Sequence, residues 1–161
     1  MKPVTLAAGL LALILAAPVG ADPRWPDQGW QVTPTSLAYD DLLEALRKAV
    51  EAEGMFVVTE AGPTAAAANR GITLPGNRVV GVFRNDYAVR ILRLSVPAMI
   101  EAPMRFYVTE NDNGSATLSW KTPSHLLEPY VDEAGEELEA VARELDTLFT
   151  AIARRVGEVS E

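Results

Sequence analysis

The chain has 161 residues, of which 48% are hydrophobic and 22% are charged, a composition typical of one ordinary globular domain. It contains no cysteine, which excludes disulfides, thiolate metal sites, iron–sulfur clusters and thiol nucleophiles. Its 14 Lys and Arg against 22 Asp and Glu give a net charge of -8, the wrong sign for a protein that neutralises nucleic-acid phosphates. We therefore expect one domain with no nucleic-acid partner.

The first 21 residues have the pattern of a secretory signal peptide. Lys2 precedes an uncharged apolar run from Leu6 to Ala17, and Val19-Gly20-Ala21 places short side chains before the expected cleavage point. The apolar run has about a dozen residues, whereas a membrane-spanning helix needs about twenty. The pattern predicts cleavage after Ala21, a periplasmic protein, and no stable membrane span in the mature chain.

The next part of the chain predicts an extended segment followed by alternating helices and strands. Residues 22–35 carry three prolines and two tryptophans, which indicates an extended lead-in whose last part can join a sheet. Apolar residues then recur at steps of three and four, which predicts a helix from its cap Ser36 to its stop Gly54. After it we expect a strand over Met55–Thr59, a short helix between Pro63 and Gly71, and a strand over Arg78–Phe83 in which Gly81 lets another group approach the backbone.

The second half predicts a helix, a hairpin and a long closing helix. Asn85 is the expected cap of a helix that ends before Pro97, with an inner face of Ala88, Ile91, Leu92 and Ser95. An Asn-Gly pair between Met104–Thr109 and Ala116–Trp120 predicts a β-hairpin. The stretch Glu136–Val156 predicts a long amphipathic helix that packs on its own sheet or on a second copy, which leaves a homodimer open. The members of its predicted apolar stripe are Leu138, Val141, Leu145, Leu148, Ile152 and Val156. Residues 36–157 thus predict one α+β domain with a largely antiparallel sheet packed against helices.

Three short motifs resemble those of a known family. They are FRNDYA (Phe83–Ala88), PAMIEAP (Pro97–Pro103) and KTPS (Lys121–Ser124). Over about Ser36 to Tyr130 the chain resembles the bacterial and archaeal family called domain of unknown function number three hundred and two. The resemblance implies a compact α+β fold with the sheet-and-helix arrangement of the TATA-binding-protein type, often in exported proteins. It implies no reaction and no catalytic residues.

A ligand-binding surface is predicted around a small set of polar and aromatic residues. Arg84 lies beside a predicted helix start, where its guanidinium and the unpaired backbone N–H groups can together bind an anion. Asp86 competes for that guanidinium. We therefore hypothesise an exported, non-catalytic domain of the cell envelope that binds a small ligand or a partner protein without a cofactor. The predicted ligand-binding residues are Arg84, Asn85, Tyr107, Lys121 and His125.

Two alternatives stay open. Haem or copper binding would use His125, the only histidine, with Met99 and Met104 as soft ligands. A hydrolase would use a pair of carboxylates, with Glu101 and Glu110 as the first to test. The plainer interpretation makes His125 a loop residue after Thr122-Pro123 and the methionines core side chains. Trp25 is expected to be disordered or loosely packed.

Overall fold

A five-stranded antiparallel sheet with helices makes up residues 24–159, the part of the chain that the computed structural model describes. The predicted signal peptide over residues 1–21 lies outside the described residues. The elements in chain order are β1 (Trp30–Ala38), α1 (Tyr39–Ala52), β2 (Phe56–Ala61), α2 (Thr64–Ala68), β3 (Asn77–Phe83), α3 (Asn85–Leu94), the 3-10 helix η1 (Pro97–Glu101), β4 (Met104–Glu110), β5 (Ser115–Lys121), α4 (Pro123–Ala134) and α5 (Glu136–Val159). Within residues 24–159, no helix has the length and apolar character needed to cross a bilayer.

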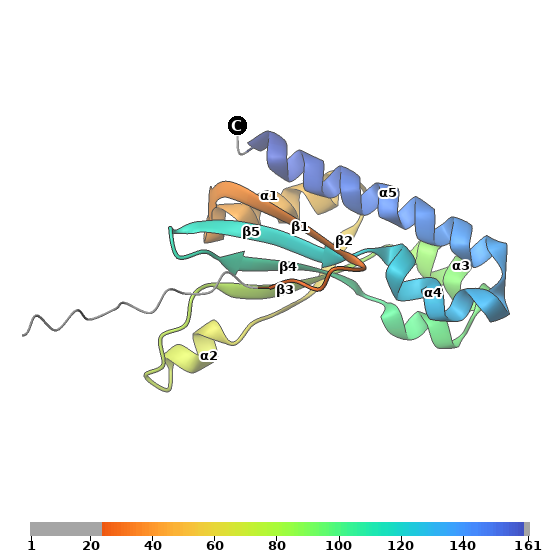
Figure 1. Ribbon diagram of the computed structural model, residues 1–161, viewed down its shortest axis with the longest axis horizontal. Coiled ribbons are helices and arrows are strands. Elements are labelled where there is room, and N and C mark those ends of the chain that lie inside the picture. Colours follow the sequence, from red (N-terminus) through yellow and green to blue (C-terminus); the bar gives the residue numbers. More distant parts are fainter. Residues whose placement is uncertain (1–23, 160–161) are drawn as a thin grey trace, which may run out of the picture.

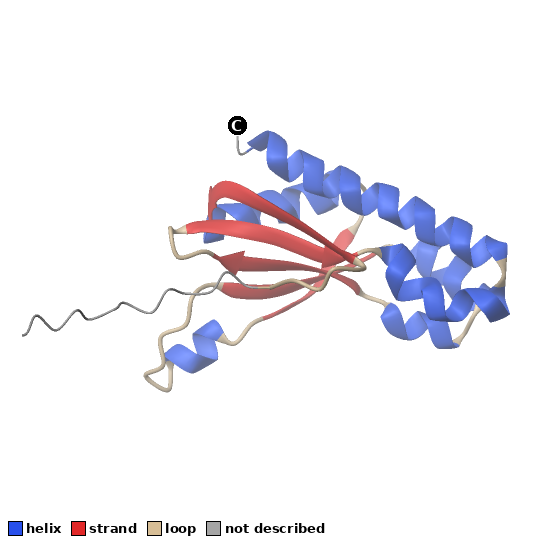
Figure 2. Cartoon of the chain, in the orientation of Figure 1, coloured by secondary structure: helices blue, strands red, loops and turns tan. Residues whose placement is uncertain are grey.

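The strands lie in the order β1-β5-β4-β3-β2, and every neighbouring pair is antiparallel. Helices α1 and α5 lie along one face of this sheet, and α5 extends past its end to lie beside α3 and α4 (Figure 1). Figure 2 shows the open sheet, which does not close into a barrel, with the long helix across it. The predicted α+β domain with its long closing helix is confirmed.

Alternation along the central strand decides which face of the sheet is the core. In β4, Met104, Phe106 and Val108 are buried, while Arg105 and Tyr107 between them point to the other face. The ring of Phe106 stacks on Phe149 of α5 with centroids 4.6 Å apart and an interplanar angle of 18°. The face with Phe106 is therefore covered by α1 and α5, and we call the face with Tyr107 the open face.

The start of α1 differs from the expectation. Ser36 lies inside β1, and the helix begins at Tyr39 after Ala38, which makes no side-chain capping hydrogen bond. The edge strand β1 pairs with β5, far along the chain, with a register shift between Pro34 and Ala38. The Ser36 cap was wrong because this pairing, which a local pattern does not reveal, draws Ser36 into the sheet.

The start of α3 also differs in detail. Arg84 has the extended backbone of the N-cap position (φ −142°), so Asn85 is the first helical residue and does not cap it. Ala88 and Ile91 face the core as predicted, but Leu92 is 48% exposed. The inner face is therefore narrower than the apolar pattern indicated.

Helix α4 was missed, and the interpretation of His125 as a loop residue was wrong. The Thr122 hydroxyl oxygen accepts a hydrogen bond from the backbone N–H of His125 at 3.3 Å, and Pro123 occupies the first turn. Thr-Pro is a usual helix start, but Pro129 inside the helix interrupts the pattern that would have revealed it. His125 therefore lies in the first turn of a helix.

The β4–β5 hairpin is confirmed, and its turn is longer than a two-residue loop. The N–H of Asn111 donates to the carbonyl of Ser115 at 2.8 Å, and the N–H of Gly114 donates to the carbonyl of Asn111 at 2.9 Å. Gly114 has φ +82°, a left-handed conformation that glycine adopts without a steric penalty. The glycine of the Asn-Gly pair thus closes a tight turn as a left-handed bulge residue.

The apolar stripe of α5 packs on its own chain. Its fully buried members include Leu138, Val141, Phe149 and Ile152, whereas Leu148 of the predicted stripe is only half-buried. Gly81 of β3 is also explained, because a β carbon there would lie 2.1 Å from Oγ1 of Thr59. The close backbone approach expected at this glycine is confirmed.

Candidate functional site

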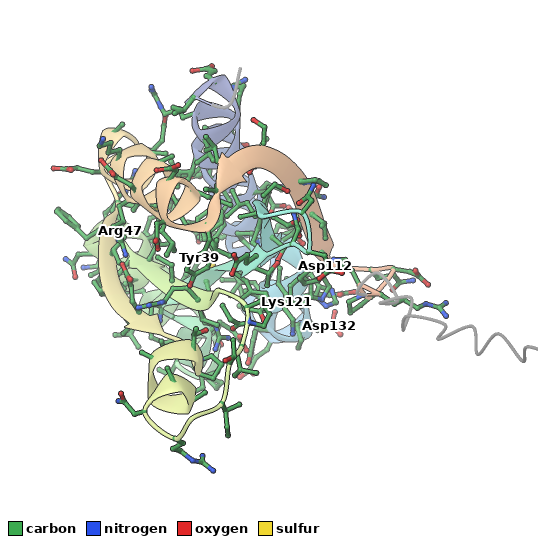
Figure 3. The ribbon with its side chains drawn as sticks, turned by 90° about the vertical axis from the view of Figure 1, so that its left-hand side faces the viewer. Tyr39, Arg47, Asp112, Lys121 and Asp132 are labelled. Atoms are coloured by element: carbon green, nitrogen blue, oxygen red, sulfur yellow. The ribbon has the colours of Figure 1, made fainter. Side chains whose placement is uncertain are left out.

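The open face of the sheet forms a groove of ≈ 390 Å³ beside the start of α4. In Figure 3, which looks along the molecule from the hairpin end, Lys121 lies on the side of the sheet away from α1 and α5. We call this hollow the open-face groove. Its lining residues are Trp30, Asn77, Val79, Arg105, Tyr107, Trp120, Lys121 and Leu126.

Strand register brings these residues together from separate parts of the chain. Trp30 of β1 lies opposite Lys121 of β5, and Val79 of β3 lies opposite Tyr107 of β4. Directly opposed side chains on one sheet face are close enough to interact. The Lys121 ammonium lies 5.7 Å from the centroid of the Trp30 ring, within the range of a cation–π contact. The groove is therefore built by pairing between distant strands.

The two cations of the groove lack carboxylate partners. Lys121 and Arg105 are both exposed, and no ion pair within residues 24–159 includes either of them. By contrast, Nε of Arg47 donates a hydrogen bond to the Glu60 carboxylate at 2.7 Å. Two unpaired cations on one concave face attract an anion.

Tyr107 supplies a hydrogen-bond donor beside these cations. The amide Nδ2 of Asn77 donates to the Tyr107 hydroxyl at 2.6 Å, which leaves the phenolic hydrogen free to donate into the groove. The hydroxyl of Ser119 donates to the Tyr107 carbonyl at 3.4 Å and supports the same strand. With the Trp30 ring, these groups suit a ligand that has an anionic end and an apolar body.

Arg84 and Asn85 lie apart from the groove. The Arg84 guanidinium makes two hydrogen bonds to Asp86, at 2.8 Å and 3.0 Å, and lies 4.4 Å from the centroid of the Tyr87 ring. The hydrogen bond from Arg84 lowers the pKa of the Asp86 carboxyl, so the pair stays ionised and the guanidinium is occupied. Arg84 borders a separate small pocket with Met104 and other side chains of the covered face. Of the five predicted residues, Tyr107 and Lys121 line the groove.

His125 lies next to the groove. Its ring packs against Gly29, where a β carbon would lie 2.2 Å from the imidazole. Its Nδ1 is 3.8 Å from the Glu128 carboxylate, and its side chain is 41% exposed. The neighbouring Leu126 lines the groove, whereas His125 borders a second hollow with Gly29.

The methionines proposed as soft ligands belong to the packed interior. Met104 is 5% exposed and faces the helices, and Met99 is partly buried against the core. Within the described range 24–159, no group of three or more His, Asp and Glu side chains is arranged to hold a metal ion. Haem or copper binding through His125, Met99 and Met104 stays a prediction.

The carboxylates named for a hydrolase do not face one another. Glu101 accepts a hydrogen bond from the Tyr130 hydroxyl at 2.9 Å, and Glu110 accepts one from the N–H of Gly76 at 2.6 Å. The strand Met104–Glu110 lies between them and extends roughly 20 Å, while paired glycosidase carboxylates lie about 5–10 Å apart. Both carboxylates have structural partners, and this pair does not form a catalytic couple.

Another groove, separate from the hollow beside His125, lies between α1 and the end of α5. The cations in it are already paired with carboxylates. This groove has a volume of ≈ 560 Å³ and includes Lys48 and Arg155. Lys48 binds Glu44 at 2.6 Å, and Arg155 donates to Glu53. Paired charges leave less attraction for a ligand than the unpaired cations of the open-face groove.

The predicted ligand-binding set lacked six of the eight groove residues: Trp30, Asn77, Val79, Arg105, Trp120 and Leu126. Period-two alternation in β4 places Arg105 on the same face as Tyr107, so this cation was within reach of the pattern. The same pattern could not place Trp30 in the groove, because its position depends on the pairing of β1 with β5.

Comparison with known proteins supports a family assignment. The family described as "Domain of unknown function DUF302" matches residues 31–152. The crystal structure of an uncharacterized conserved DUF302 protein from Bacillus stearothermophilus is 18% identical, with a TM-score of 0.71, and the alignment covers 80% of this chain and 98% of that chain. At this identity the likeness shows the fold alone, and none of the curated proteins matches. The chain belongs to the DUF302 family.

Proposed function

We propose that this DUF302 chain is an exported, non-catalytic domain of the cell envelope that binds a small organic anion in the open-face groove. The observation that carries the proposal is the convergence of two unpaired cations, Lys121 and Arg105, with the rings of Trp30 and Tyr107 on one concave face. Charged donors hold the anionic end, and the rings and Val79 contact the apolar part.

The chemistry of the groove favours binding over turnover. Its polar side chains are a lysine, an arginine, a phenol and an amide, and no carboxylate or histidine of residues 24–159 lines it. The groups that most often transfer protons near neutral pH are histidines and carboxylates with shifted pKa values. The groove therefore offers hydrogen-bond donors that hold a negative charge.

Binding is tested with hexanoate, which has one charge and a flexible apolar tail. Hexylammonium has a similar tail and the opposite charge, so it measures the contribution of the tail alone. Chemical-shift changes in a 15N-labelled protein spanning residues 22–161 give the affinity of each. We expect hexanoate to bind several-fold more tightly than hexylammonium and to shift the signals of β4 and β5.

The charge contribution is tested with Lys121→Gln and Arg105→Gln. Each is expected to weaken hexanoate binding about tenfold, because a hydrogen bond to a charged group contributes about 1.5–3 kcal/mol. Lys48→Gln is the matched control, since Lys48 is an exposed lysine of α1 paired with Glu44. Equal affinities for hexanoate and hexylammonium, or unchanged binding in Lys121→Gln, would contradict the proposal.

Export is supported by the charge and apolar pattern of residues 1–21. N-terminal sequencing of the protein from fractionated bacterial cells tests it. The expected product is found in the periplasmic fraction and begins at Asp22. A product in the cytoplasmic fraction that begins at Met1 would show that this segment does not direct export.

A further inference from the structure

Residues 24–29 form an N-terminal arm that runs over the open face before β1 begins (Figure 1). The indole of Trp25 contacts two rings of the groove at once. It lies 5.2 Å from the Trp30 ring at an interplanar angle of 48°, and 6.1 Å from the Tyr107 ring at 73°. Both are favourable geometries for aromatic pairs. The expected disorder or loose packing of Trp25 is therefore not what the structure shows.

Within the described part of the chain, a hydrogen bond fixes the arm at Gly29. The carbonyl of Gly29 accepts a hydrogen bond from the N–H of Thr122 at 2.9 Å, and Gly29 has φ +72° with the His125 ring against it. Within residues 24–159, no hydrogen bond or ion pair joins residues 24–28 to the rest of the chain. The ring contacts of Trp25 therefore hold the arm on the sheet beyond Gly29.

We propose that Trp25 occupies an aromatic subsite of the groove, and that the ligand is an aromatic anion whose ring takes the place of the Trp25 indole. This inference rests on the proposed function and adds the ligand class and a means of regulation. The ring of such a ligand would contact Trp30 and Tyr107 as Trp25 does. Its negative charge would lie beside Lys121 and Arg105, which Trp25 leaves without an anionic partner.

The energetics favour exchange. Among the described residues, no hydrogen bond joins residues 24–28 to the sheet, so undocking the arm costs only the ring contacts of Trp25 and the area that they bury. A ligand that provides both a ring and a negative charge gains contacts that the neutral indole lacks. The arm therefore competes with the ligand. The apparent affinity of the ligand equals its intrinsic affinity multiplied by the fraction of molecules in which the arm is undocked.

The test uses indole-3-acetate, with indole and hexanoate as separate probes of the ring and the charge. The chain has three tryptophans, so the indole N–H signals of a 15N-labelled protein report on each separately. We expect indole-3-acetate to bind more tightly than either probe and to move the Trp25 signal to its position in a solvent-exposed peptide. The backbone N–H signals of α5, which lies along the opposite face of the sheet (Figure 1), report that the fold is intact.

Trp25→Ala removes the internal occupant, and Gln28→Ala is the matched control on the same arm. We expect Trp25→Ala to tighten indole-3-acetate binding roughly two- to tenfold, the range set by one or two aromatic contacts, and Gln28→Ala to leave it unchanged. Unchanged or weaker binding in Trp25→Ala would overturn the exchange. If hexanoate binding still depends on Lys121 in that case, the anion site stands and only the role of Trp25 fails.

Discussion

Gly76 and the ring of Tyr39 are in direct contact, because a β carbon at residue 76 would lie 2.5 Å from Cγ of Tyr39. Tyr39 is the first residue of α1, between that helix and the strands in Figure 3, and Gly76 precedes β3. Gly76 is held on both sides, since its N–H donates to the Glu110 carboxylate at 2.6 Å and its carbonyl accepts from the Glu110 N–H at 2.9 Å. This contact joins the first helix to the start of β3, and the two hydrogen bonds to Glu110 hold the Gly76 backbone in place.

Gly76→Ala is therefore expected to destabilise the protein by about 1–3 kcal/mol, the usual cost of an added methyl group in a packed site. Urea denaturation followed by circular dichroism measures the change. The double variant Gly76→Ala with Tyr39→Ala should show a favourable coupling energy, because the smaller side chain removes the clash. A loss below about 0.5 kcal/mol in Gly76→Ala would show that the ring moves aside easily.

Tyr39→Phe tests the hydroxyl of the same side chain. The Tyr39 oxygen is buried and has no hydrogen-bond partner within the described part of the chain. Removing an unpaired buried polar group is expected to leave the stability unchanged or to raise it by up to about 1 kcal/mol. The same denaturation measurement decides this, and a loss of more than about 1 kcal/mol would show that the hydroxyl has a partner such as ordered water.

Glu60 gives a prediction on pH. Its carboxylate accepts hydrogen bonds from Arg47 at 2.7 Å and 2.8 Å and lies 3.5 Å from Arg78, so one side chain links α1, β2 and β3. The hydrogen bond from Arg47 lowers the pKa of Glu60 below its ordinary value of 4.5. Since the folded-state pKa is the lower one, this stabilisation is present above about pH 4.5 and is lost as the pH falls through the folded-state pKa.

Glu60→Gln should therefore reduce stability by roughly 0.5–1 kcal/mol at neutral pH, a modest figure because water screens this partly exposed cluster. Denaturation curves at a series of pH values test the sign. The difference between the two proteins is expected to shrink below about pH 4.5 as the wild-type carboxylate becomes protonated. A difference that grows on acidification would contradict the assignment.

Phe149 of α5 was absent from the predicted apolar stripe, yet it is fully buried and stacks on Phe106. Phe149→Ala is expected to cost about 3–5 kcal/mol, from lost burial and the cavity that remains. Leu148→Ala is the matched control, because Leu148 is only half-buried and should cost distinctly less. Thermal or urea denaturation compares the two. Equal losses of stability in the two variants would mean that the apolar stripe of α5 is centred on Leu148.

Local sequence patterns predicted the fold correctly where the interactions lie within one helix or one hairpin. The steps of three and four in α5 and the Asn-Gly turn between β4 and β5 are of this kind, and both elements are present. The end of β1 was mispredicted because Ser36 makes a good helix cap in isolation, while pairing with β5 places it in a strand. Tertiary pairing overrode the local preference there.

The candidate site was predicted only in part, for the same physical reason. Tyr107 and Lys121 were selected as polar or aromatic residues near the hairpin, and both line the groove. Trp30 joins them because β1 adds to the far edge of β5, and Trp25 joins them because the arm folds back at Gly29. Neither event leaves a local signal, so the ring contacts of the groove required the structure.

The separation of Arg84 from the open-face groove leads to a last prediction. Its guanidinium is bound by Asp86 and borders a different pocket, so Arg84→Gln should leave hexanoate affinity unchanged within about twofold. Arg105→Gln, which removes an unpaired cation from the groove, should weaken that affinity about tenfold. The same nuclear magnetic resonance titration measures both. If Arg84→Gln weakens binding as much as Arg105→Gln, the anion lies at the start of α3, where the sequence pattern had placed a site, and the open-face groove is not where it binds.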